Sequence, residues 1–154
     1  MHIPILGGIS LSVNLQEDET IEDLQLQGLK LIQKKDGFRY GMDTVLLAHF
    51  ADIKKNDTVV DLGTGNGIIP LLLYGRNKGK SYFALDILQE AAMLAERNVI
   101  LNNLTEKISI ICADAIDASN HIMPCSIDAV VCNPPYGHPY ASLVSPVNAK
   151  AIAR

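Results

Sequence analysis

The residues best suited to chemistry form the motif Asn133-Pro134-Pro135-Tyr136. A run of β-branched and apolar residues, 127–132, precedes the motif and predicts a buried strand. Proline cannot donate a hydrogen bond to a neighbouring strand, so this strand must end at the motif. The side-chain oxygen of Asn133 and the backbone carbonyl of Pro134 could then accept hydrogens from a planar amine, while Tyr136 stacks on a flat base. The alternative is a proline-rich turn that only closes a core strand.

A glycine-rich turn provides a second candidate site. Residues 63–67, Gly-Thr-Gly-Asn-Gly, follow a predicted strand at 58–62, and glycine allows the backbone to approach a ligand closely. The last glycine of a dinucleotide fingerprint would fall on Ile68, which weakens the case for a nicotinamide cofactor. A turn that accepts an amino-acid group beside a nucleoside suits S-adenosylmethionine better. Asp61, at the end of the strand, would face the ammonium group of that cofactor.

Two further acids follow predicted strands. Asp86 ends the strand 81–86, where a carboxylate can accept bonds from both hydroxyls of a ribose. Asp114 comes just after the strand 108–112 and has two interpretations of equal weight. It could accept a hydrogen from the adenine amine of the cofactor, or it could cap the N-terminus of a helix over residues 115–121.

The order of the predicted elements indicates an α/β fold. Four strands alternate with helical segments at 68–77, 88–102 and 115–121, a pattern typical of a parallel sheet with helices on both faces. Counted along the chain, a strand order of 3-2-1-4 would make strands one and four neighbours. The glycine turn and Asn133 would then meet at the carboxyl edge of the sheet, where open sheets bind ligands.

The N-terminal part of the chain has a different pattern. Residues 1–20 are expected to be a loose extension and residues 21–154 the domain, which opens with a β-hairpin between residues 22 and 39. A helix over 41–50 follows, with Asp43 as its N-cap. The hairpin carries a cluster of cations, which are either solvated or in contact with phosphates: Lys30, Lys34, Lys35 and Arg39.

Composition narrows the class of protein. The net charge of −4 gives no overall basic field, so any RNA contact must use local patches. Neither the histidines nor the cysteines have metal-ligand spacing, and no apolar run is long enough to span a membrane. Cys112 and Cys132 lie in apolar strand runs, which predicts reduced, structural thiols and a cytoplasmic protein.

Together these motifs resemble the class I, Rossmann-like S-adenosylmethionine-dependent methyltransferases, and among them the Asn-Pro-Pro-Tyr subgroup that methylates planar nitrogens. Residues 28–33, 37–43, 45–48 and 61–70 further resemble a bacterial family of tRNA adenine-N6 methyltransferases that act beside the anticodon of a valine tRNA. The resemblance implies one set of cofactor-binding residues, Asp61, Gly63, Gly65, Asp86 and Asp114. It implies that Asn133, Pro134 and Tyr136 hold a target base that has left its stack.

The resemblance also defines the alternatives. The same platform serves enzymes that methylate a glutamine amide in a release factor or guanine N2 in ribosomal RNA, and a short chain could instead be a non-catalytic cofactor-binding or dimerisation module. The family has strands and helices beyond those predicted here. The resemblance therefore implies a C-terminally truncated domain whose exposed sheet edge favours self-association or inactivity.

Overall fold

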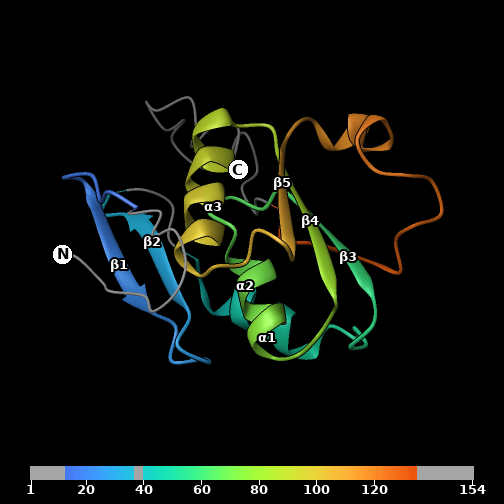
Figure 1. The fold of residues 1–154 in the computed structure, drawn as a ribbon, viewed down its shortest axis with the longest axis horizontal. Coiled ribbons are helices and arrows are strands. Elements are labelled where there is room, and N and C mark those ends of the chain that lie inside the picture. Colours follow the sequence, from blue (N-terminus) through green and yellow to red (C-terminus); the bar gives the residue numbers. More distant parts are fainter. Residues whose placement is uncertain (1–12, 37–39, 135–154) are drawn as a thin grey trace, which may run out of the picture.

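The computed structural model describes residues 13–36 and 40–134, and Figure 1 shows their arrangement. Tyr136, predicted to hold the target base, lies outside the described residues, as does Arg39 of the cation cluster. The elements in chain order are β1 (Glu19–Asp23), β2 (Lys30–Lys34), α1 (Met42–Phe50), β3 (Thr58–Leu62), α2 (Ile68–Gly75), β4 (Ser81–Asp86), α3 (Gln89–Leu101), β5 (Ile108–Cys112), the 3-10 helix η1 (Ala115–Asn120) and β6 (Ala129–Cys132).

The central sheet has the predicted topology. Its strands follow the order β5-β4-β3-β6, and every neighbouring pair is parallel. Strands β3, β4 and β5 have the predicted bounds, and β6 is shorter than predicted because it begins at Ala129. The predicted order 3-2-1-4 is therefore confirmed, and β3 lies between β4 and β6 at the centre of the sheet.

Helices cover the two faces of this sheet unequally. Alternate strand residues such as Val59, Tyr82 and Val131 pack into the main core with α1, α2, α3 and the hairpin. On the other face, Val60, Leu85 and Ile122 form a smaller cluster, and partly buried residues of β3, β4, β5 and of the segment that contains η1 pack against it. Figure 1 shows the hairpin and three α-helices on one side of the sheet and this segment, in orange, on the other.

Two asparagines one helical turn apart, Asn98 in α3 and Asn102 at its C-cap, anchor the hairpin. Asn98 accepts from Ile32 N at 2.6 Å and donates to Ile32 O at 2.9 Å. Asn102 makes the same pair of bonds to Lys30, at 2.8 and 2.7 Å. Because Lys30 and Ile32 lie on the same edge of β2, the two amides take the place of a neighbouring strand. They satisfy backbone groups that would otherwise lose their partners on burial.

The N-terminal strand starts earlier than predicted. Glu19 and Thr20, placed in the loose extension by sequence, begin β1 and pair with Lys34 and Gln33 of β2. Glu19 is buried and receives a bidentate ion pair from Arg97 of α3, at 2.6 and 2.8 Å. The charge of Glu19 is therefore compensated by Arg97 of α3, a contact that the sequence alone does not show.

Helix α1 is held at both ends. At its C-terminus Lys78 Nζ donates to the carbonyls of His49 and Ala51, at 2.5 and 2.7 Å. At its N-terminus the prediction for Asp43 is wrong, because Gly41 occupies the N-cap position and no side chain caps the helix. Asp43 instead lies in the first turn, where its carboxylate is available for a contact outside the helix.

Candidate active site

The register of the sheet brings the two predicted sites together. Leu62 of β3 pairs with Cys132 of β6, so the glycine turn and Asn133 leave adjacent parallel strands at the same level. Neighbouring strands are about 4.8 Å apart. Leu62 also pairs with Leu85 of β4, which places Asp86 on the other side of the same turn.

The glycine turn has a backbone that other residues rarely adopt. Gly63 and Gly65 have φ of 73° and 59°, in the left-handed region that glycine enters without strain. A Cβ atom added to either residue would meet nothing within 4 Å, so both border open space. The amides of Gly63 and Thr64 donate to Leu85 O at 2.9 and 2.8 Å, which fixes the turn on the end of β4.

Asp86 closes this turn from the neighbouring strand. One carboxylate oxygen accepts from Gly65 N at 2.7 Å and the other from Leu88 N at 2.9 Å. The side chain is only 8% exposed, and these two bonds hold it in place at the edge of the sheet. Its predicted role, accepting from a ribose, stays a prediction that this geometry accommodates.

Asp61 is the most unusual group of the site. It is 1% exposed, and neither of its carboxylate oxygens, nor the buried hydroxyl of Thr64, has a hydrogen-bond partner within the described part of the chain. Burial raises the pKa of Asp61 to about 7; the nearby Thr64 hydroxyl lowers this pKa in part, and the charge of Asp86 raises it further. A buried carboxylate without partners is costly, and a bound cation would remove that cost.

Asp114 lies further along the edge, after β5. Its carboxylate accepts from Ile116 N at 3.0 Å and caps η1. The capping interpretation is therefore observed, and the adenine-binding interpretation stays a prediction. Asp114 follows the strand next to the one that Asp86 ends, so the three acids form a row along β3, β4 and β5.

Asn133 is joined to the first turn of α1. Its side-chain nitrogen donates to Thr44 Oγ1 at 2.9 Å and to Asp43 Oδ2 at 3.2 Å. Thr44 is buried and Pro134, the next residue of the motif, is exposed. Sequence reasoning missed Thr44 and Thr64, because neither belongs to a recognisable spacing and their contacts arise only in the folded chain.

The residues present fit S-adenosylmethionine. The unpartnered carboxylate of Asp61 suits its ammonium group, and the open space before Gly63 and Gly65 leaves room for its methionine part. Asp86, held at the same edge, is placed to accept from ribose hydroxyls. Among the described residues no cluster of acids, histidines and cysteines could hold a metal, and no helix is long and apolar enough to cross a membrane.

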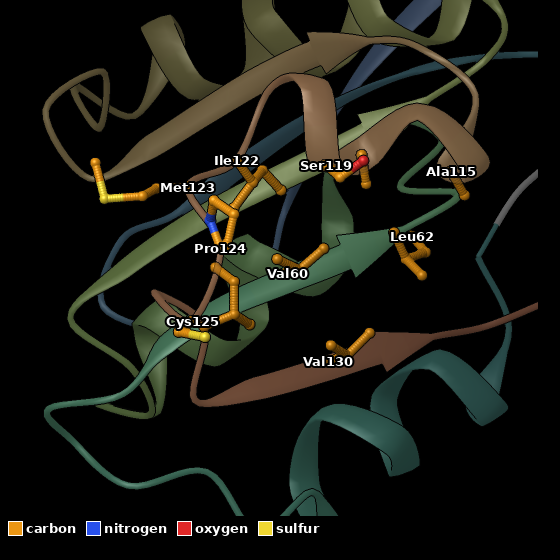
Figure 2. A pocket seen from close by; sticks show the side chains of 11 residues that line it. Val60, Leu62, Ala115, Ser119, Ile122, Met123, Pro124, Cys125 and Val130 are labelled. Carbon is orange, nitrogen blue, oxygen red and sulfur yellow. The ribbon is translucent and has the colours of Figure 1, made fainter.

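A second hollow lies on the opposite face of the sheet. Figure 2 shows Val60 and Leu62 of β3 and Val130 of β6 facing Ile122 and Ser119, around a cavity of about 300 Å³. None of its lining residues is charged, so it lacks the groups that the site needs.

The cysteines differ from their predicted role. Cys112, Cys125 and Cys132 are free, as predicted, but all three are exposed. Cys112 and Cys132 end β5 and β6, where the strands reach the surface. Each lies in a strand run as predicted, but its exposure means that the thiol does not pack in the core.

Comparison with known proteins identifies the class. The sequence matches the family described as the methyltransferase small domain over residues 37–150, and the chain belongs to that family. The structure of TrmK from M. capricolum, determined with S-adenosylhomocysteine, matches with a TM-score of 0.54 and 25% identity, covering 62% of this chain and 41% of that one. The Rossmann-like class I methyltransferase fold is thereby confirmed.

Sequence relatives point to a narrower group. A tRNA1(Val) (adenine(37)-N6)-methyltransferase from Pasteurella multocida is 31% identical over 99 residues, covering 64% of this chain and 41% of the relative. A protein of the same name from Bacteroides fragilis is 32% identical over 102 residues, covering 66% and 43%. The chain thus spans less than half the length of these curated relatives.

Proposed function

We propose that the chain is an S-adenosylmethionine-dependent N-methyltransferase whose substrate is the N6 amine of an adenine in tRNA. The observation that carries the proposal is the pairing of Leu62 with Cys132, because it sets the glycine turn beside Asn133. The tRNA and adenine in the names of the two relatives support the choice of substrate.

Each residue has a defined task in this proposal. When bound, S-adenosylmethionine supplies a methyl group on a positively charged sulfur. Asp61 balances the ammonium charge, the Gly63–Gly65 turn admits the ligand, and Asp86 and Asp114 orient its nucleoside. The side-chain oxygen of Asn133 and the carbonyl of Pro134 accept the hydrogens of the target amine, so that the lone pair of the amine nitrogen is directed out of the plane of the ring. Tyr136 stacks on the base.

These acceptors matter because charge changes during the reaction. An exocyclic amine is a weak nucleophile, and its nitrogen becomes positive as the new bond forms. Dipoles already oriented toward that nitrogen stabilise the transition state more than the ground state. Holding the two reactants side by side lowers the barrier further. The bond from the methyl carbon to sulfur would break as the bond to nitrogen forms, and the positive nitrogen would then give one proton to water, so no strong general base is required.

The test offers the purified chain tritiated S-adenosylmethionine with tRNA, ribosomal RNA or a peptide release factor in separate reactions. Label in tRNA that is recovered as N6-methyladenine is the expected result, and Asn133→Ala should abolish it. Asn120→Ala, which changes an exposed asparagine of η1, is the matched control and should not lower the rate. Label found only in the release factor, or only in ribosomal guanine, would overturn the choice of substrate.

A further inference from the structure

The contact between Asn133 and α1 joins residues that are far apart in the chain. Asn133 Nδ2 donates to Thr44 Oγ1 at 2.9 Å and to Asp43 Oδ2 at 3.2 Å, across about 90 positions of sequence. Thr44 is only 2% exposed, so its hydroxyl is held in place by the surrounding core. Two neighbouring residues of one helix therefore face a single amide group.

This contact fixes which way the amide points. An asparagine side chain has two N–H donors on nitrogen and only acceptors on oxygen. If the Asn133 amide were turned over, its oxygen would face the carboxylate of Asp43, and two acceptors would repel each other. The hydroxyl of Thr44 can donate or accept, so Asp43 decides the orientation. The side-chain oxygen of Asn133 consequently points away from α1.

Gly41 makes room for this arrangement. A Cβ atom at Gly41 would lie 2.4 Å from the other carboxylate oxygen of Asp43. The backbone of Gly41, with φ −101° and ψ −177°, is ordinary extended chain that any residue adopts. Glycine at this position thus leaves room for the observed placement of the Asp43 carboxylate, which a Cβ atom would displace.

We infer that Gly41, Asp43 and Thr44 are positioning residues, which act through Asn133 and orient its oxygen toward the target amine; this inference rests on the proposed function. A carboxylate that accepts from the amide nitrogen also polarises the amide, which strengthens its oxygen as an acceptor. The three residues therefore prepare the acceptor before the base arrives, and no reorganisation is needed when charge develops.

The kinetic test compares Thr44→Val with Thr44→Ser. Valine keeps the size of the side chain and removes the hydroxyl, so kcat for methyl transfer should fall about tenfold or more, a loss typical of groups that orient a reacting residue. The Kd for S-adenosylhomocysteine should stay within about twofold, because Thr44 does not serve the cofactor turn. Serine should restore most of kcat. Equal loss in both variants, or a loss confined to cofactor binding, would overturn the inference.

A second measurement does not depend on activity. In the NMR spectrum of the intact chain, the two side-chain amide protons of Asn133 should be well separated and slow to exchange. Asp43→Ala and Gly41→Ala should both shift these signals toward those of a free asparagine amide, with backbone signals outside the start of α1 and the Asn133 region unchanged. Unshifted Asn133 signals in both variants would refute the positioning role.

The two measurements separate the possible failures. If the unmodified chain transfers no methyl group to RNA but the Asn133 signals respond as described, the proposed function fails and the contact with α1 stands. If methyl transfer is present and Thr44→Val leaves kcat unchanged, the proposed function stands and the positioning role fails.

Discussion

At the scale of single residues, Asp61 shows how a fold can prepare a site at a cost in stability. Its carboxylate lies at the carboxyl end of the central strand, fully buried and without a hydrogen-bond partner in the described part of the chain. Desolvation favours its neutral form, which raises its pKa to about 7. The group is therefore poised to ionise near neutral pH when a cation is bound beside it.

This predicts a pH dependence of stability. The pKa of Asp61 rises from 3.8 to about 7 on folding, so between these values the folded chain holds a proton that the unfolded chain releases. The stability from this group is complete below about pH 4 and is lost as pH rises to about 7, by at most about 1.4 kcal/mol per pH unit. Asp61→Asn should remove this loss and raise the free energy of unfolding above pH 7 in urea titrations. Asp117→Asn, at an exposed aspartate of η1, is the matched control. A profile for Asp61→Asn that is parallel to the parent would contradict the prediction.

Binding of the cofactor should release a proton for the same reason. Below pH 7 an ammonium group beside Asp61 favours the ionised carboxylate, so the affinity for S-adenosylhomocysteine should rise between about pH 5.5 and 7.5. Calorimetry at pH 6 in two buffers of different ionisation enthalpy measures the proton directly. We expect up to about one proton released by the parent chain and none by Asp61→Asn. Binding without proton release would show that Asp61 does not face the cation.

At the scale of elements, the hairpin and the glycine turn share a support. Besides its bonds to Ile32, the Asn98 side-chain nitrogen donates to Asn66 O in the glycine turn at 2.9 Å. Asn102 bonds to Lys30 and to its own helix, and not to the turn. The two asparagines thus hold the same strand, and of the two only Asn98 also bonds to the glycine turn.

Replacing each asparagine should separate these effects. Asn98→Ala leaves buried backbone groups without partners and should lower the free energy of unfolding by about 2–4 kcal/mol, at about 1–3 kcal/mol per unsatisfied group. It should also weaken binding of S-adenosylhomocysteine several-fold. Asn102→Ala should destabilise the chain less and leave that affinity unchanged. Urea unfolding and calorimetry on both variants check this, and an equal loss of affinity in the two would argue against the bond to Asn66.

The sequence predicts elements better than the contacts between them. Strands 58–62, 81–86 and 108–112 have the predicted bounds because each is a short, mainly apolar run that glycines or polar turns separate from its neighbours. The start of β1 was missed because Glu19 is charged, and its burial depends on Arg97. The asparagines 98 and 102, spaced four apart on a helix, were a weak signal of a shared face.

The candidate site divides in the same way. Asp61, Gly63, Gly65, Asp86 and Asn133 could be placed at one edge from strand ends alone, and the register of β3 with β6 agrees. The contact of Asp43 with Asn133 could not be foreseen, since it joins two segments about 90 positions apart. Its only trace in the sequence is an acid at the start of a helix, which is common.

At the scale of the whole molecule, the sheet is covered well on one face and sparsely on the other. In the part of the chain that the structure describes, β6 is bordered by β3 alone, and Val130 on this strand is 60% exposed beside the apolar cavity of about 300 Å³. Edge strands with exposed apolar side chains tend to pair with another chain. Contacts between copies are therefore expected at this edge.

A charge at this edge should oppose such contacts. We expect the chain to show a mass above that of the monomer in size-exclusion chromatography with light scattering, and Val130→Lys to shift it toward the monomer. Leu46→Lys, at a residue of α1 that is 46% exposed, introduces the same charge elsewhere and should have no such effect. A monomer at all concentrations would disprove self-association.

Lys78 is hydrogen-bonded at the C-terminal end of α1 and Asn133 at the N-terminal end. The length of this helix therefore sets the distance between the two contacts. One alanine inserted in its middle would preserve helical propensity but rotate one end against the other by about 100° and shift it by about 1.5 Å. The chain would then lose either the contact with Lys78 or the orientation of the Asn133 amide. The nine-residue length of α1 is therefore constrained: its residues can be substituted, but the helix cannot gain a residue without disturbing one of the two attachments.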